Sequence, residues 1–526
     1  MDLARLGGGI RRSGSDLAHL PAKDTMTASP PVEGSSATPA EPTSTGSSGE
    51  VPLPGRWIAL AVLALAQFVL VLDSTVVNVA LPSIQRQFDL PEARLAWIVN
   101  GYGLAFGGLL LLGGSLGDLY GRRKLFMLGI GVFSGASLIA GLAWNADIII
   151  AMRFLQGAGA AMAAPAALSS ITRIFTIPKE RTKALGTWGG ISALGGTIGA
   201  VLSGFITEYQ SWRWVFFVTV PVTLIALALA PKFVPESRAP SRPKLDVLGA
   251  ILITSAIGTA VFALLDKGAK AWTDPLLLAQ LAGAAVLVVI FIAWEKRQTM
   301  PMVPLDIFKN RNRVVGVTAS VLFGSVLSTY FFTTTLYMQT VLGFKPLKTG
   351  AAYLPLGLII LVAFPIISAL VGRIGVRVVM TTGLLSGMSG LLVLATLQVD
   401  GTYRGDVLPG MILVAIAAAC GFVTFTIAGV DGTTEENAGI ASGILSAGGQ
   451  IGSALGLATL VSIAVSVQVS EAASQIPRPQ ALVDGFAAAY HVGAGILFVG
   501  AVIAAVFLRS TASNTAATAA KMSASN

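Results

Sequence analysis

The chain has 526 residues, of which 54% are hydrophobic and only 12% are charged, and its mean hydropathy of +0.76 predicts an integral membrane protein rather than a soluble one. The formal net charge is +9, but Lys and Arg are scattered between apolar runs, which argues against a nucleic-acid-binding surface. One cysteine, Cys420, excludes an internal disulfide framework, and two histidines, His19 and His491, leave little for metal chemistry.

Residues 1–54 are rich in Ser, Thr, Pro, Gly and Ala and are predicted to be a disordered tail, as are residues 509–526. The first tail has no apolar stretch, so we do not expect it to be a cleaved signal peptide. Between the tails lie fourteen mostly apolar runs of about 20 residues, the length that a helix needs to cross the hydrocarbon. The predicted spans are 57–80, 94–113, 125–144, 148–170, 184–206, 214–231, 247–265, 275–294, 314–338, 349–370, 376–397, 407–428, 439–465 and 487–508.

The basic residues gather in alternate connections between these spans. Because cytoplasmic loops carry an excess of Lys and Arg, the dense connections are predicted to be cytoplasmic, and so are both termini. These connections lie at 122–124, 173–183, 232–244 and 296–313.

Two stretches of small residues suggest an internal repeat. The fifth span reads GGTIGA from Gly195 and Gly196 through Gly199, and the thirteenth reads GGQIGS from Gly448 to Gly452 and beyond. Glycines spaced by four residues allow helices to pack at backbone contact. The chain is therefore predicted to hold two related six-helix halves, 55–232 and 298–508, joined by a linker at 233–297 with two extra spans, which is typical of alternating-access transporters.

The connection after the second span reads GSLGDLYGRRK over residues 114–124. Gly114 and Gly121 permit a tight turn, and Asp118 can pair with Arg122, Arg123 or a helix end. This spacing resembles the signature loop between the second and third spans of the major facilitator superfamily, in which the loop acts as a gate. A basic loop that only marks the cytoplasmic side is the alternative.

Two ionisable residues lie inside predicted spans. Asp73 belongs to the first span, in the string LDSTVVNVALP, and Arg153 opens RFLQGAGAA in the fourth. A charge at membrane depth is costly, so a functional role is the default hypothesis for each. The alternatives are an acid near a helix end that reaches water and an arginine at the membrane boundary.

Both strings resemble the corresponding motifs of the fourteen-span drug:proton antiporter family within that superfamily. The resemblance runs from about residue 57 to 508. It implies an all-α polytopic fold and an exporter of drug-like, antibiotic or other amphipathic molecules, with Asp73 and Arg153 in proton coupling. It further implies that the loop after the second span docks onto the start of the thirteenth, at 435–437. The family's fifth-span motif has Pro where this chain has Gly196, which leaves an uptake symporter of the same fold as an alternative.

The resemblance also implies which partners the protein has. The expected partners are a small-molecule substrate, protons and the lipid bilayer of the cytoplasmic membrane, with no cofactor besides the proton gradient, no metal, no nucleic acid and a monomeric state. A membrane enzyme would need a nucleophile and base or a metal cluster, and the sequence indicates neither. Candidate residues for the substrate cavity, each of which could instead form a helix–helix hydrogen bond, are Asn78, Asn100, Tyr102, Gln156, Tyr337 and Gln339.

Overall fold

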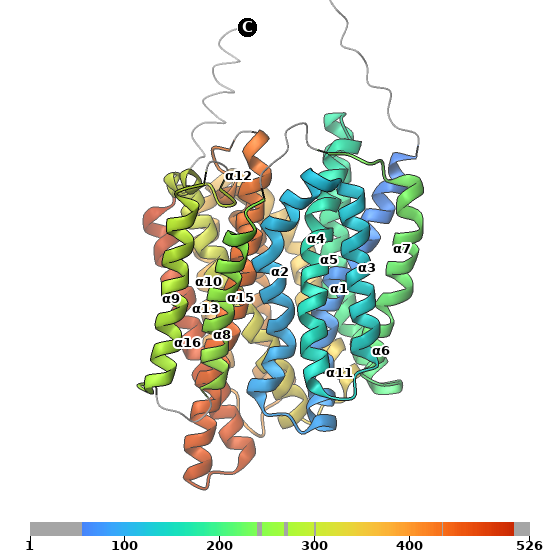
Figure 1. Ribbon diagram of the computed structural model, residues 1–526. Helices are drawn as coiled ribbons and strands as arrows, with labels where there is room; N and C mark the ends of the chain where they lie inside the picture. The colour runs from blue at the N-terminus through green and yellow to red at the C-terminus, as the bar shows by residue number, and fades with distance from the viewer. Residues whose placement is uncertain (1–54, 239–244, 268–271, 299–300, 434, 510–526) are drawn as a thin grey trace, which may run out of the picture. The chain divides into compact units, whose positions relative to one another are not determined.

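The computed structural model describes residues 55–238, 245–267, 272–298, 301–433 and 435–509, so the predicted tails fall almost wholly outside it. All regular elements in the described part are helical (Figure 1). They are α1 (Arg56–Phe88), α2 (Glu92–Tyr120), α3 (Arg122–Gly141), α4 (Ala146–Ile174), α5 (Pro178–Tyr209), α6 (Trp214–Phe217), α7 (Thr219–Phe233), α8 (Val247–Asp266), α9 (Pro275–Glu295), η1 (Leu305–Lys309), α10 (Arg311–Leu336), η2 (Tyr337–Val341), α11 (Pro346–Ala352), α12 (Leu354–Ile374), α13 (Val376–Leu394), η3 (Tyr403–Val407), α14 (Leu408–Gly429), α15 (Glu435–Ala473) and α16 (Arg478–Phe507).

Thirteen helices in the described ranges are long and apolar enough to cross a membrane. Four of them combine neighbouring elements: α6 with α7, α10 with η2, α11 with α12, and η3 with α14. The predicted fifth span corresponds to α5, whose described stretch Ile198–Tyr209 is apolar but shorter than a full span. The polytopic all-α membrane fold is thus confirmed, and the other thirteen predicted spans correspond to apolar helices of spanning length in the described ranges.

Several helices begin at a residue whose side chain satisfies the first free N–H groups. Asn145 accepts from Ile148 N before α4, and Asp274 accepts from Leu276 N and Leu277 N before α9. Asn310 does the same before α10. Such caps fix the start of a helix, typically by about 1 kcal/mol each.

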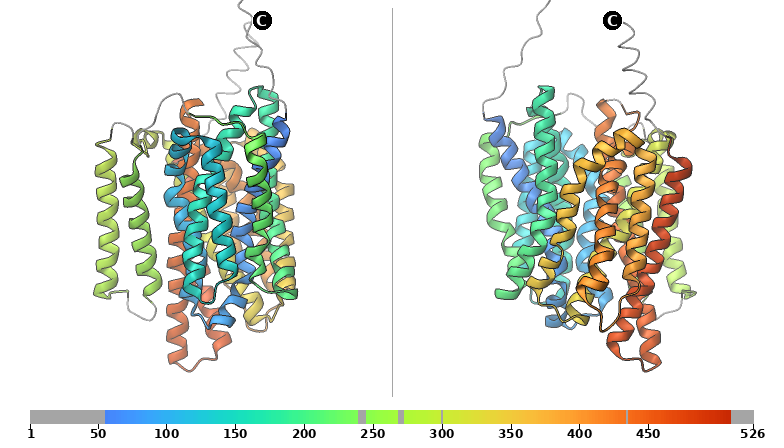
Figure 2. Two further views of the ribbon diagram at one scale, coloured as in Figure 1. Left: turned by 45° about the vertical axis from the view of Figure 1, so that its right-hand side comes forward. Right: turned by 180° about the vertical axis from the view of Figure 1, so that it is seen from behind.

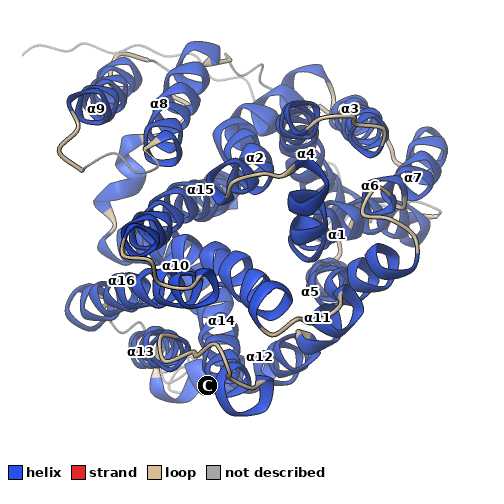
Figure 3. Cartoon of the chain, turned by 90° about the horizontal axis from the view of Figure 1, so that it is seen from below, coloured by secondary structure: helices blue, strands red, loops and turns tan. Residues whose placement is uncertain are grey.

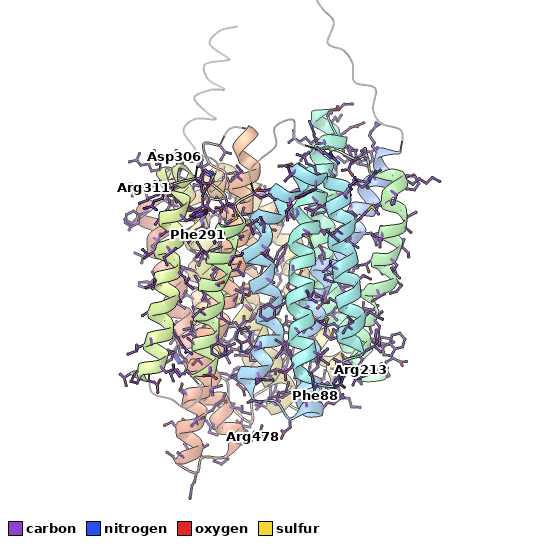
Figure 4. All side chains as sticks on the ribbon, viewed as in Figure 1. Phe88, Arg213, Phe291, Asp306, Arg311 and Arg478 are labelled. Carbon is purple, nitrogen blue, oxygen red and sulfur yellow. The ribbon has the colours of Figure 1, made fainter. Side chains whose placement is uncertain are left out.

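The labelled side chains in Figure 4 define two ends of the helix bundle. Asp306 and Arg311 lie at one end, which also holds the α2–α3 turn, and Phe88, Arg213 and Arg478 lie at the other (Figures 1 and 4). We call them the Asp306 end and the Arg478 end. α15 and α16 reach farther than the other helices at the Arg478 end (Figure 2).

The helices pack in pairs that are far apart in sequence. α1 packs against α5, α10 against α15, and α2 against both α4 and α15 (Figure 3). The predicted linker helices α8 and α9 pack against each other, and α8 also lies against α2 and α15 on the outside of the bundle. α9 is largely exposed, which suits a helix that faces lipid.

Candidate functional site

Asp73 lies near the middle of the 33-residue helix α1. Its side chain is 1% exposed, so the alternative of an acid reaching water from a helix end does not fit the structure. A buried carboxylate needs a cation or several donors nearby. The structure provides both, from α4.

Arg153 on α4 is the cation that faces Asp73. Its Nη1 donates to Asp73 Oδ2 at 2.5 Å, and its Nε donates to the Ile98 carbonyl of α2 at 2.9 Å. The Arg153 side chain is only 2% exposed, so the guanidinium lies inside the bundle and not at the membrane boundary. An arginine in such a place stays protonated, which leaves Asp73 as the member of the pair that can gain or lose a proton.

Gln156 lies one turn beyond Arg153 and completes the cluster. Its Nε2 donates to Asp73 Oδ1 at 3.0 Å and to Ser137 Oγ of α3 at 2.8 Å, while its Oε1 accepts from Arg153 Nη1 at 3.1 Å. Both oxygens of Asp73 are therefore occupied by donors from α4. The sequence reasoning placed Gln156 in a substrate cavity and missed Ser137, because a serine in an apolar span has no periodic signal.

Tyr102 on α2 also contacts this arginine. The Arg153 guanidinium carbon is 4.5 Å from the centre of the Tyr102 ring, and the Tyr102 hydroxyl donates to the Leu70 carbonyl at 3.4 Å. A cation over an aromatic face gains about 2 kcal/mol when it is desolvated. Four helices, α1 to α4, thus hold one acid, one permanent cation and their polar partners in a dry cluster.

The chemistry of this cluster follows from its charges. With Asp73 ionised, the Asp73–Arg153 pair is neutral. With Asp73 protonated, Arg153 keeps its contacts to Ile98 and Gln156 but loses its counter-ion. The cluster therefore has two charge states that differ by one proton, and only the second carries a net positive charge.

The predicted gate residues form the turn between α2 and α3. Gly121 has φ +111°, a conformation that favours glycine, and connects the two helices directly. Arg122 donates from Nε and Nη2 to Asp118 Oδ1 at 3.1 and 2.7 Å, one of the pairings that the sequence allowed. Gly114 lies one turn before Asp118. A Cβ added to Gly114 would lie 3.9 Å from Pro165.

The structure adds Glu236, which the sequence reasoning missed. This acid follows α7, and its Oε1 accepts from Arg123 N at 3.2 Å, while Arg122 N donates to the neighbouring Ser237 carbonyl at 3.0 Å. A Cβ on Gly121 would lie 2.5 Å from Glu236 Oε1. A single acid in a loop gives no periodic sequence pattern. Only its position directly after a predicted span could have identified Glu236 as a candidate site residue.

The family resemblance implies that this turn docks onto residues 435–437. The side chains of those residues lie outside the described part of the chain, so the docking stays a prediction.

Four other predicted cavity residues lie at separate places. Asn78 donates to the Ser74 carbonyl within α1, and Asn100 is buried with no partner for its Nδ2. Tyr337 donates to the Gln398 carbonyl at 2.7 Å. Gln339 donates to the Val79 carbonyl at 2.9 Å and so joins η2 to α1. Tyr337 and Gln339 thus make the helix–helix or helix–loop hydrogen bonds that the sequence left open as the alternative.

The predicted packing glycines lie at close helix contacts. A Cβ on Gly199 would meet Thr75 Oγ1 at 2.2 Å, and one on Gly452 would meet the Val321 carbonyl at 2.1 Å. A Cβ on Gly195 would lie 3.1 Å from its nearest neighbour in α1, and one on Gly448 would lie 3.3 Å from its nearest neighbour in α10. These two glycines therefore lie in the same helix pairs, α1–α5 and α10–α15, with slightly more space. Gly196, which stands where the family has Pro, has its nearest neighbour at 4.0 Å, and α5 runs through it without a break.

Contacts between the predicted halves are prominent at the Arg478 end. Leu347 N donates to Glu208 Oε2 at 3.0 Å, and a Cβ on Gly204 would meet the Pro346 carbonyl at 2.4 Å. At the other end of α5, Gly186, Gly189 and Gly190 have nothing within 4 Å of an added Cβ. α5 thus contacts the second predicted half near its Arg478 end, through Pro346 and Leu347.

In a comparison with protein families, the model described as "Major Facilitator Superfamily" matches residues 63–457. Among curated proteins, the chain is 36% identical over 472 residues to the puromycin resistance protein pur8 of Streptomyces alboniger, a match that covers 87% of this chain and 92% of that protein. It is also 36% identical to the lincomycin resistance protein of Streptomyces lincolnensis, over 86% of this chain and 91% of that protein. The cephamycin export protein CmcT of Amycolatopsis lactamdurans is 34% identical, over 77% and 84%.

Solved structures share the fold at low sequence identity. The POT family transporter PepTSo matches with a TM-score of 0.65 at 14% identity, over 86% of this chain and 97% of that chain. The human organic anion transporter MFSD10 matches with a TM-score of 0.55 at 16% identity, over 86% of this chain and all of that chain. At these identities the likeness concerns the fold alone.

Proposed function

Because the chain belongs to the major facilitator superfamily, we propose that it is a proton-coupled efflux transporter that exports antibiotics or other amphipathic small molecules. Relatives named for puromycin resistance, lincomycin resistance and cephamycin export support the direction and the substrate class. These matches extend over most of each relative, so they concern the whole transporter and not one half.

The observation that carries proton coupling is the buried Asp73–Arg153 pair. A single titratable acid, held by a cation that cannot titrate, gives the two charge states that an antiporter needs. In the proposed cycle, proton binding at Asp73 releases the arginine from its counter-ion, and proton loss restores the neutral pair. A cationic or amphipathic substrate would be favoured in the state with the ionised acid, so proton and substrate would compete.

The proposed location is the cytoplasmic membrane, with both termini and the Asp306 end in the cytoplasm. Support comes from the basic residues that gather at this end, among them Arg122, Arg123 and Arg311. The contacts of α5 with Pro346 and Leu347 would then lie on the outer side of the membrane. No cofactor beyond the proton gradient is proposed, and a monomer is sufficient because the cluster lies within one chain.

Efflux is tested by resistance and by transport. Expression in a host without its own exporters should raise resistance to puromycin, lincomycin or a related antibiotic. Everted membrane vesicles should then take up that antibiotic when a proton gradient is imposed and stop when the gradient is collapsed. Uptake by intact cells instead of everted vesicles would support the symporter alternative and contradict export.

A further inference from the structure

Ser137 on α3 is the member of the Asp73 cluster whose hydrogen bonds leave it a single role. The residue is fully buried, and its Oγ donates to the Phe133 carbonyl of the same helix at 2.8 Å. Because a hydroxyl carries one proton, this oxygen can only accept from any further partner. That partner is Gln156 on α4, whose Nε2 donates to Ser137 Oγ at 2.8 Å.

The orientation of the Gln156 amide follows from its three partners. Its Nε2 faces two acceptors, Ser137 Oγ and Asp73 Oδ1, and its Oε1 faces one donor, Arg153 Nη1. A turned amide would place its oxygen against both acceptors and its N–H groups against the guanidinium. Ser137 therefore helps to hold the N–H side of this amide toward Asp73.

The packing of α3 on α4 fixes the contact between Ser137 and Gln156 in space. A Cβ on Gly159 would lie 2.8 Å from Phe133 N, and a Cβ on Gly129 would lie 2.6 Å from the Gly159 carbonyl. The two backbones thus touch within about one turn of both residues. Ser137 is therefore presented to the Gln156 amide by two helices that cannot approach each other further.

The arrangement suits the ionised form of Asp73. Each carboxylate oxygen faces a donor, with Arg153 Nη1 at Oδ2 and Gln156 Nε2 at Oδ1. A protonated carboxyl group must itself donate from one oxygen, so it needs an acceptor there. To offer its Oε1 to that proton, Gln156 would have to turn its amide, and Ser137 opposes this rotation.

We propose that Ser137 is a positioning residue that acts through Gln156 to set the pH at which Asp73 takes up a proton. The inference rests on the proposed function, in which Asp73 is the acid that binds the coupled proton. Without the hydroxyl, one N–H group of Gln156 loses its acceptor, and the orientation that suits the ionised acid is less favoured. Asp73 should therefore take up its proton at a higher pH in Ser137→Ala.

The helices packed on α1 leave few ionisable groups that could set this pH instead. Arg153 stays protonated, and the Tyr102 hydroxyl donates to a backbone carbonyl of α1. Every other Asp, Glu, Lys or Arg of the helices packed on α1 lies near a helix end. The buried Tyr330 of α10 packs against the ring of Tyr353. The neutral hydrogen-bond partners of Asp73 are therefore the groups that can tune its proton uptake.

Infrared difference spectroscopy of the full-length protein in lipid nanodiscs measures the protonation of Asp73 without transport. The carboxylic acid band that appears as the pH falls, and that Asp73→Asn lacks, gives the midpoint of proton uptake. Ser137→Ala should raise this midpoint by about 0.5–1 pH unit, the scale of one neutral hydrogen bond. The pH profile of drug transport in proteoliposomes should shift in the same direction.

Two comparisons separate this role from a general change in packing. Ser134→Ala removes another buried serine of α3, which accepts from Thr223 outside the cluster, and should keep the wild-type midpoint. In a Gln156→Met background, Ser137→Ala should cause no further shift, because the serine acts through the glutamine. An equal shift in both backgrounds would show that Ser137 does not act through Gln156 and would overturn the proposal.

A second substitution keeps the proposal testable if Ser137→Ala does not fold. Ser137→Cys fills a similar space with a weak acceptor and should also raise the midpoint. An unchanged midpoint in a folded Ser137 variant would overturn the inference and leave proton coupling at Asp73 intact. A wild-type protein without any band that depends on Asp73 would contradict the proposed function itself, and the inference with it.

Discussion

Gln156 donates to Asp73 from the same face of α4 as Arg153, and the two residues hold the two oxygens of one carboxylate at 3.0 and 2.5 Å. Because Gln156 also donates to Ser137 on α3, the position of Asp73 depends on three helices besides its own. The charge of Asp73 and the packing of α1 to α4 are therefore linked through short polar contacts. A change of protonation at Asp73 must alter at least two of these contacts.

Replacing Arg153 by Lys tests whether charge alone is sufficient. Arg153 donates hydrogen bonds to Ile98, Asp73 and Gln156 at once. Its guanidinium carbon also lies 4.5 Å from the centre of the Tyr102 ring, and a single ammonium group cannot reproduce this fork. We expect Arg153→Lys to lose at least tenfold in transport rate although the charge is kept. Arg153→Ala should also lose stability, by about 3–5 kcal/mol, because it leaves a buried acid unpaired.

Transport assays and thermal unfolding in detergent measure the two effects separately. Full transport by the folded Arg153→Lys protein would show that the fork and the ring contact are not needed.

Replacing Gly121 by Ala should destabilise the α2–α3 turn for two reasons that can be separated. The backbone has φ +111°, and the new Cβ would lie 2.5 Å from Glu236 Oε1. We expect a loss of about 1–3 kcal/mol in the free energy of unfolding, the usual cost of a strained backbone. Adding Glu236→Ala should recover only the part that comes from the close contact.

The control for this pair is Glu236→Ala alone, which removes the contacts to Arg123 without strain. Complete recovery in the double variant would contradict the backbone contribution.

Replacing Gly452 by Val tests the packing of α15 on α10. A Cβ there would lie 2.1 Å from the Val321 carbonyl, so the helices must separate. We expect a fall in stability of about 1–3 kcal/mol, as for overpacked cores. Gly495→Val on α16 is the matched control, since a Cβ there has nothing within 4 Å.

Thermal unfolding of both purified variants measures the difference. Equal melting temperatures would show that α10 and α15 adjust to the added side chain without cost.

Much of the fold could be predicted from apolar runs of spanning length, but the helix ends could not. α15 continues to Ala473, eight residues beyond the predicted end at 465, and part of this extension contacts α16, where a Cβ on Gly485 would lie 2.8 Å from the Gln468 side chain. α5 likewise begins at Pro178, before the predicted start at 184, because its polar first turn lies outside the apolar run. A hydropathy pattern marks the apolar run and does not contain the polar turns that extend a helix at either end.

The candidate site was predictable where a charge interrupts an apolar run. Asp73 and Arg153 each stand out in this way, although their sequence separation of 80 residues hides that they meet. Ser137 and Glu236 did not stand out, because a serine in a helix and an acid in a loop are common at places without any function.

The most direct test of the proposed coupling is proton-driven drug accumulation by Asp73→Asn in proteoliposomes, with drug exchange at equal pH measured alongside. Asn keeps the shape of the side chain and removes the titratable proton, so the account predicts that exchange continues while accumulation driven by the pH gradient is lost. Accumulation at the wild-type level by the Asp73→Asn protein would contradict a coupling role for the Asp73–Arg153 pair.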